Sequence, residues 1–210
     1  TIDAVSGAIE VIASAALAVI DSSLSLPAAA SAPIGLVGEA GDALTYAVCF
    51  DGDIYAIDPD GLSVTQVRSP DSAKVVDAVH TENDEILLLS PANSAMDGGA
   101  IDCFKLDTRD VHGSLPLSSG VPGEMAFASD RLYFSTESNQ KAYPCLVVAD
   151  PDKTAAPGTA NPTEVNRIRQ ARGGLRVGAN GSNVFVHSER AAVMSAFEPA
   201  STPTQPEFVG

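Results

Sequence analysis

Three histidines are the side chains best suited to acid–base catalysis or metal binding in this sequence. His80, His112 and His187 lie far apart along the chain, and no two of them have the close spacing that marks a metal site within one element. Repeats arranged around an axis could still bring a histidine next to an acid of another repeat. An enzyme that uses His80 or His187 is therefore one hypothesis, although the sequence itself predicts no metal and no cofactor.

Other catalytic motifs are absent. The sequence contains no Gly-x-Ser-x-Gly, no phosphate-binding loop and no His-Glu-x-x-His, which mark hydrolases, nucleotide-binding proteins and zinc proteases. The run Asp-Pro-Asp-Gly at 58–61 shares two acids with a calcium loop, but the distal glutamate of such a loop does not follow. Aspartate, proline and glycine each favour a turn. We therefore expect a turn here, and a protein that is not an enzyme.

The three cysteines predict a structural role. Cys49, Cys103 and Cys145 are odd in number, far apart, and each inside a predicted strand. Disulfide frameworks and zinc sites use paired or closely spaced cysteines, so buried free thiols are expected. Free thiols favour synthesis in a reducing cytoplasm.

The charge of the chain limits its partners. The sequence has 27 acids and 12 bases, for a net charge of −15. Binding of phosphate groups needs clustered cations, and an anionic membrane surface would repel this chain. We therefore expect no nucleic-acid partner and no membrane partner. The acidity is equally compatible with a salty habitat or with simple solubility.

One basic cluster interrupts this acidic sequence, at Arg167, Arg169, Arg172 and Arg176. Arg167 and Arg169 alternate on a predicted strand and so share one face. On the outermost strand of a sheet, such charges protect an exposed edge against unwanted pairing. The alternative is a surface for an acidic partner, such as another copy of this chain, and it makes Arg167 and Arg169 candidate interaction residues.

These side chains would be positioned by a unit that recurs along the chain. Its clearest copy, residues 121–151, reads as an apolar strand, a Ser129-Asp130 turn, a second strand, a polar loop and a third strand that ends in Asp-Pro. The third strand closes on an acid in all four copies, with spacings of 49, 43 and 48 residues between Asp58, Asp107, Asp150 and Glu198. Paired apolar positions precede these acids at Val37 and Leu44, Val79 and Ile86, Met125 and Leu132, and Val177 and Val184. This period is typical of propeller blades.

The sequence therefore predicts an all-β fold, a four-bladed β-propeller-like repeat of antiparallel meanders preceded by an N-terminal α-helix. We expect residues 1–33 to be the helix and a linker, and residues 34–210 to be the propeller domain. The four repeats are expected at 34–69, 74–118, 121–170 and 173–210. Four blades could close into a narrow ring, stay open, or combine with another chain, since open arrays leave edges that natural proteins avoid.

The first 33 residues do not carry the repeat. Their apolar residues recur at alternating steps of three and four, which is the seam of a helix that packs on another helix. The uninterrupted apolar run is too short to span a membrane, and acids stand where a signal peptide carries bases. We expect a retained helix that covers its apolar face on its own blades or, preferably, on copies of the chain or other subunits of an assembly. The candidate interaction residues on this face are Ile2, Val5, Ile9, Ile12, Ala16 and Val19.

The repeat resembles the YVTN-type repeats of bacterial and archaeal surface propellers. The resemblance covers residues 34–210 and includes the Ser-Asp or Asn-Asp turns, a strand such as Arg-Leu-Tyr-Phe-Ser at 131–135, a polar loop with asparagine, and a strand that ends in Ile-Asp. It implies a propeller fold, usually with about seven blades, whereas four are counted here. It implies little about function, because propellers include enzymes, ligand binders and scaffolds.

The function that we predict is that of a non-catalytic structural or interaction protein. A propeller head would be tethered by its N-terminal helix to a larger assembly such as a virion or a surface appendage, with copies of itself or other subunits as partners. The first alternative is an extracytoplasmic propeller that binds a glycan or small ligand through loops 91–99 and 137–144. The second is an enzyme with an axial active site. The sequence does not reveal the localisation.

Overall fold

The computed structural model of this chain consists of antiparallel β-sheets. It describes residues 11–13, 18–21, 24–38, 43–70, 74–81, 84–91, 99–117, 121–137, 145–151, 162–169, 175–180, 183–188, 193–198 and 207–208. Four four-stranded sheets follow one another along the chain, and a two-stranded sheet precedes them. The expected all-β fold with four propeller-like blades is confirmed.

Each four-stranded sheet is a meander in which strands adjacent in sequence pair with one another. We number these sheets as blades 1 to 4. Blade 1 contains β3 (Pro33–Val37), β4 (Thr45–Cys49), β5 (Ile54–Asp58) and β6 (Ser63–Arg68). Blade 2 contains β7 (Asp77–Thr81), β8 (Glu85–Pro91), β9 (Gly99–Lys105) and β10 (Asp110–Leu117). Blade 3 contains β11 (Val121–Ala128), β12 (Arg131–Glu137), β13 (Cys145–Asp150) and β14 (Thr163–Arg169). Blade 4 contains β15 (Leu175–Ala179), β16 (Val184–Ser188), β17 (Val193–Glu198) and β18 (Glu207–Phe208).

Tight turns join the strands where the sequence predicts them. Ser129 and Asp130 both have positive φ angles, of 50° and 58°, as a two-residue hairpin turn requires. Gly52, in the Asp-Gly turn of blade 1, has a φ of 86°. Because glycine, aspartate and asparagine adopt this region more readily than other residues, these turns fix the register of the strands on either side. Ala128 thus pairs directly with Arg131.

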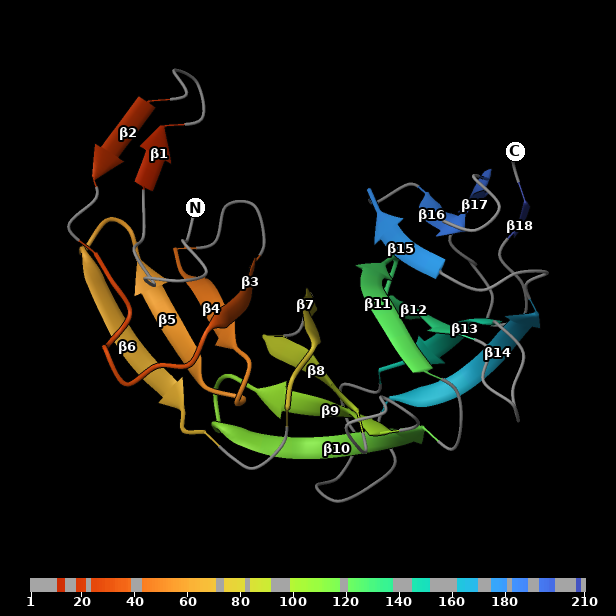
Figure 1. Cartoon of the computed structure of the whole chain (residues 1–210), viewed down its shortest axis with the longest axis horizontal. Helices are drawn as coiled ribbons and strands as arrows, with labels where there is room; N and C mark the ends of the chain where they lie inside the picture. The colour runs from red at the N-terminus through yellow and green to blue at the C-terminus, as the bar shows by residue number, and fades with distance from the viewer. Residues whose placement is uncertain are drawn as a thin grey trace.

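The four blades stand side by side in an arc (Figure 1). Their first strands line the inside of this arc, and β3 contacts β7, β7 contacts β11, and β11 contacts β15. Blades 1 and 4 lie at its two ends, so the described residues form an open arc and not a closed ring. One face of blade 1 and one face of blade 4 therefore have no neighbouring blade.

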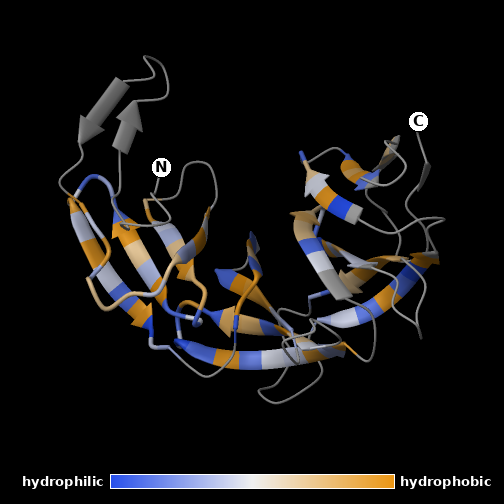
Figure 2. Cartoon of the chain, in the orientation of Figure 1, coloured by the Kyte–Doolittle hydropathy of each residue, from blue (hydrophilic) through white to orange (hydrophobic). Residues whose placement is uncertain are grey.

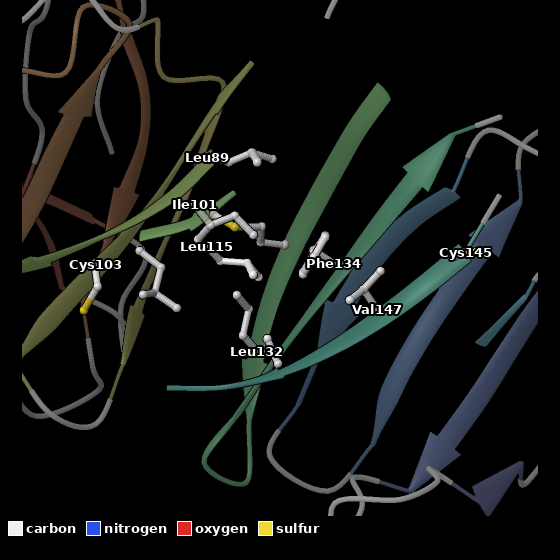
Figure 3. Close-up of a cluster of buried hydrophobic side chains, with 11 residues drawn as sticks. Leu89, Ile101, Cys103, Leu115, Leu132, Phe134, Cys145 and Val147 are labelled. Carbon is white, nitrogen blue, oxygen red and sulfur yellow. The ribbon is translucent and has the colours of Figure 1, made fainter. Parts of the chain in front are cut away.

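Apolar side chains fill the spaces between neighbouring blades. Hydrophobic residues recur along the strands that face another blade (Figure 2). Between blades 2 and 3, Leu89 and Ile101 lie opposite Phe134 and Val147 (Figure 3). Similar clusters join blade 1 to blade 2 and blade 3 to blade 4. The core is thus a series of inter-blade layers, as in other repeat architectures.

The N-terminal segment departs from its predicted helix where the structure describes it. Val11–Ala13 form strand β1 and Ala18–Asp21 form strand β2, and the two strands pair antiparallel. The prediction of a helix over these residues is therefore wrong. Short apolar runs rich in valine and isoleucine suit a strand as well as a helix, and periodicity alone does not separate the two. No helix able to cross a membrane is found within the described residues.

The predicted linker is also more than a linker. Leu24 and Leu26 are buried against the free face of blade 1, on a cluster that includes Tyr55 and Ile57. The Ser31 hydroxyl donates a hydrogen bond of 2.6 Å to the Asp51 carboxylate. Residues that the sequence places outside the propeller therefore cover one end of the arc, which is the role of a capping segment in a repeat protein.

The register differs from the sequence pattern at two positions. Asp58, Asp150 and Glu198 end the third strands β5, β13 and β17, as expected. In blade 2, β9 ends at Lys105, so Lys105 takes this position and Asp107 lies in the following turn. In blade 1, Thr45 pairs with Ile57 just as Leu132 pairs with Ala149. Leu44 therefore corresponds to Arg131, one position earlier than the sequence spacing suggests.

Candidate functional site

The candidate interaction residues of the N-terminal segment are described only in part. Ile12 lies in β1 and Val19 in β2, and the two residues are direct cross-strand partners. Ile2, Val5, Ile9 and Ala16 lie outside the described residues. Ile12 and Val19 therefore do not share the face of a helix. They lie on two paired strands, where side chains alternate between the two faces.

The candidate arginines lie on β14, the last strand of blade 3. Arg167 donates two hydrogen bonds to Glu164, from Nε at 2.9 Å and from an Nη at 2.8 Å. Arg169 pairs through its backbone with Cys145, and its side chain is outside the described part. The exposed outer strand predicted by sequence is present, and Arg167 is committed to a bidentate ion pair within its own strand.

The three histidines lie on three different strands, β7, β10 and β16. His80 on β7 stacks on Tyr46 of blade 1, with ring centroids 5.9 Å apart, and both of its ring nitrogens are buried without a hydrogen-bond partner. His187 on β16 pairs through its backbone with Arg176 and Met194. No group of three or more histidine, cysteine or acidic side chains that could hold a metal occurs among the residues described.

The three cysteines are buried and free, as predicted. Burial raises the pKa of Cys49 to about 12, and the acids Asp51 and Asp53 act in the same direction. Burial also raises the pKa of Cys103. A thiol with a raised pKa is a poor nucleophile at neutral pH. Cys103 and Cys145 pack in the core between blades 2 and 3, and Cys49 packs on the free face of blade 1 with Leu24 and Leu26.

The outer face of blade 4 has no neighbouring blade among the described residues. In blade 3, Tyr133, Leu146 and Val148 face blade 4 and are almost fully buried. The matching positions in blade 4, from the register of β16 with β17, are Phe185, Met194 and Ala196. The Met194 side chain is 64% exposed. Phe185 and Ala196 are half-buried, and His187, the direct partner of Met194, lies on the same face. Blade 4 therefore presents a partly apolar face at the position that blade 4 itself covers on blade 3.

A second surface feature lies between blades 1 and 2. It is a groove of about 280 Å³ that opens beside the β5–β6 and β9–β10 turns. Leu44, Tyr46 and Ala56 form part of its apolar floor, and Asp58 and Arg109 contribute opposite charges. The remaining lining residues are Ser63, Thr65, Val67 and Leu106.

The turn that carries Asp58 is rigidly built. One carboxylate oxygen of Asp58 accepts hydrogen bonds from the backbone N–H groups of Asp60 at 3.0 Å and Gly61 at 2.7 Å. A Cβ at Gly61 would lie 2.4 Å from the other carboxylate oxygen, so a larger residue there would displace the Asp58 carboxylate. Asp58 forms no ion pair with Arg109 or with any other residue in the described part of the chain.

A buried acid joins blades 2 and 3 on the inside of the arc. The Asp77 carboxylate on β7 accepts a hydrogen bond of 2.6 Å from the backbone N–H of Met125 on β11. It also accepts one from the N–H of Ala78. Burial raises the pKa of Asp77 to about 6, and the nearby Glu124 adds to this effect, while the two hydrogen bonds oppose it. Asp77 thus ties two blades together while its charge is disfavoured.

Sequence reasoning did not find the groove or the outer face of blade 4. Both depend on what lies across a blade boundary, which a period along one chain does not show. The only available signal for the groove was the change of residue at one repeat position, from Arg131 in blade 3 to Leu44 in blade 1. The shifted register of blade 1 concealed this correspondence.

Sequence comparisons do not assign this chain to a family. No family model matches it, and no curated protein matches it. Similarity appears only between structures. The chain matches a chain of the mitotic checkpoint complex with 11% identity and a TM-score of 0.59, over 82% of this chain and 48% of that chain.

Two further solved structures are similar to this chain. For Kuenenia stuttgartiensis hydrazine synthase the identity is 11% and the TM-score 0.64, over 93% of this chain and 58% of that chain. For the Neurospora crassa Pan2 WD40 domain the identity is 10% and the TM-score 0.64, over 97% of this chain and 59% of that chain. The chain thus spans about half to three-fifths of the length of these three chains. At these identities the similarity shows a propeller-like fold alone.

Proposed function

We propose that this protein is a non-catalytic structural protein, a propeller-like head that is held in a larger assembly. Its N-terminal segment would act as a tether, and the outer face of blade 4 would bind another subunit. The partners are copies of this chain or other subunits of the assembly. A virion or a surface appendage is the kind of assembly that we favour.

The outer face of blade 4 is the observation that carries this proposal. Its apolar residues Phe185, Met194 and Ala196 match positions that are buried in blade 3. Exposed apolar surface of this kind marks interaction sites on soluble proteins. Blade 1 differs, because Leu24 and Leu26 already cover its free face.

Charge supports an assembly of proteins over other partners. A net charge of −15 keeps a free head soluble and disfavours nucleic acid and anionic membranes. Arg176, exposed on blade 4, forms an ion pair of 3.0 Å with Glu124 of blade 3.

The loops proposed for ligand binding, 91–99 and 137–144, lie largely outside the described residues, so no observation favours an axial ligand site over an assembly surface.

The tether is tested by the native mass of the full chain beside a chain that lacks residues 1–23. Residues from Leu24 onward are kept because they cover blade 1. We expect the full chain to form a defined oligomer, and the shortened chain to keep its fold and have a smaller native mass. Monomers of equal stability in both cases would overturn the tether and leave no assembly to explain.

A further inference from the structure

Blades 1, 2 and 3 can be compared at two equivalent positions, one at or directly before the start of the second strand and one at the end of the third strand. Glu85 and Lys105 are direct partners in blade 2, and the register of blades 1 and 3, continued by one residue, gives the equivalent positions there. In blade 3 these residues are Arg131 and Asp150, which form an ion pair of 2.9 Å. In blade 2 they are Glu85 and Lys105, 3.7 Å apart. In both cases, the acid and the base come from the same blade.

Blade 1 breaks this rule. Its two equivalent residues are Leu44 and Asp58, so the acid remains and the base is missing. Small side chains, Ala56 where blade 3 has Val148, and Ser63 and Thr65 on β6, leave the groove of about 280 Å³ open. The place that the Arg131 side chain fills between blades 3 and 4 is therefore vacant between blades 1 and 2.

The residues that line this groove favour a ligand with a cationic group, an aliphatic stem and a carboxylate. Tyr46 is the register equivalent of Tyr133 and lines the groove. One face of its ring stacks on His80, and the part of the ring that lines the groove can contact an aliphatic stem or a guanidinium group. Asp58 stands where Asp150 binds a guanidinium. Arg109, on the opposite wall, is a cation that can take a carboxylate. A volume near the lower end of the range for ligand pockets calls for a small molecule or a single residue.

From these correspondences, we propose that the groove between blades 1 and 2 binds arginine that carries a free carboxylate. The guanidinium lies on Asp58, the stem lies on Leu44 and Tyr46, and the carboxylate meets Arg109. Free arginine and a C-terminal arginine residue of a partner protein share this chemistry. The proposal does not depend on the assembly proposed above, because ligand binding and native mass are separate measurements.

The test is a titration of the full chain with four probes, followed by NMR at the backbone amides of residues 44–46, 56–58 and 109. L-arginine is expected to shift these amides at the lowest concentration. L-citrulline, which is neutral at the guanidinium position, and agmatine, which lacks the carboxylate, are each expected to bind about fivefold more weakly, as for loss of a solvent-accessible ion pair. N-acetyl-L-arginine mimics the C-terminal residue. If it binds as well as L-arginine, the source is a protein terminus, and if only L-arginine binds, the source is the free amino acid.

Three variants make the assignment specific. Asp58→Asn keeps an oxygen for the turn and is expected to abolish the preference for L-arginine over L-citrulline. Asp60→Asn changes the same charge in the same turn without lining the groove, and is expected to leave binding unchanged. Leu44→Arg should fill the groove with an ion pair like that of blade 3 and prevent binding in a folded chain. Equal binding of L-arginine and L-citrulline by the original chain, or unchanged binding in Leu44→Arg, would overturn the proposal.

Discussion

The outer faces of blades 3 and 4 carry similar residues but have different surroundings. Leu146 of blade 3 is fully buried under blade 4, whereas Met194, at the same position of blade 4, is 64% exposed. The apolar pattern of a repeat therefore does not stabilise a blade by itself. The stabilisation comes from the neighbour that covers the face, and Met194 of the last blade has no such neighbour among the described residues.

The largest effect is expected from truncation of these two equivalent residues. Leu146→Ala removes buried methyl groups and should lower the free energy of unfolding by about 2–5 kcal/mol. Met194→Ala should change it by less than about 0.5 kcal/mol in the monomer, because its side chain is already in water. Urea denaturation at low protein concentration measures both values. Equal losses would mean that the blade 4 face is covered within one chain.

The covered end of the arc provides the next contrast. Leu26→Ala, on the face of blade 1, should cost about 2 kcal/mol, at the low end of the range for a buried leucine because its cluster lies at the edge of the core. Leu36→Ala on β3, where the side chain is 38% exposed, is the matched control and should cost much less. A negligible loss for Leu26→Ala, measured by thermal and urea denaturation, would show that the segment does not cap blade 1.

The contact between blades 2 and 3 should respond to pH through Asp77. Its folded-state pKa of about 6 lies above the ordinary value of 3.8, so the folded chain holds the proton more tightly than the unfolded chain. The free energy of unfolding should therefore rise as pH falls from 6 to 4, by about 1–3 kcal/mol from this group. Asp77→Asn should lose this pH dependence and be less stable, because its amide nitrogen cannot accept an N–H. Denaturation curves of both proteins between pH 4 and 7 give the difference, and parallel profiles would contradict it.

The smallest expected effect is that of the blade 3 ion pair. A double-mutant cycle with Arg131→Met and Asp150→Asn should give a coupling of about 0.2–1 kcal/mol, since both side chains are partly exposed. The coupling should decrease as salt is added. A coupling energy of zero at low salt would mean that the Arg131–Asp150 pair does not stabilise blade 3. Blade 1, which lacks such a pair, would then lose no stability through its absence.

The sequence predicted the elements well because turns and strands are local. The Asp-Gly and Ser-Asp turns, and the alternation of apolar residues, mark the four meanders without reference to any distant contact. The N-terminal prediction was wrong over residues 11–13 and 18–21 because a run such as Val-Ile-Ala satisfies two periods at once. The two candidate surfaces could not be predicted, since the exposure of Met194 and the open groove beside Asp58 both depend on which blade lies opposite.

The most direct test of the proposed assembly surface is the native mass of the full chain and of Met194→Asp, measured by light scattering over a range of concentrations. Leu62→Asp is the control, because it places the same charge on an exposed leucine of the β5–β6 turn. We predict that the original chain and Leu62→Asp form the same oligomer and that Met194→Asp, still folded, has a smaller mass. An unchanged mass for Met194→Asp would contradict the role of blade 4 as the docking face.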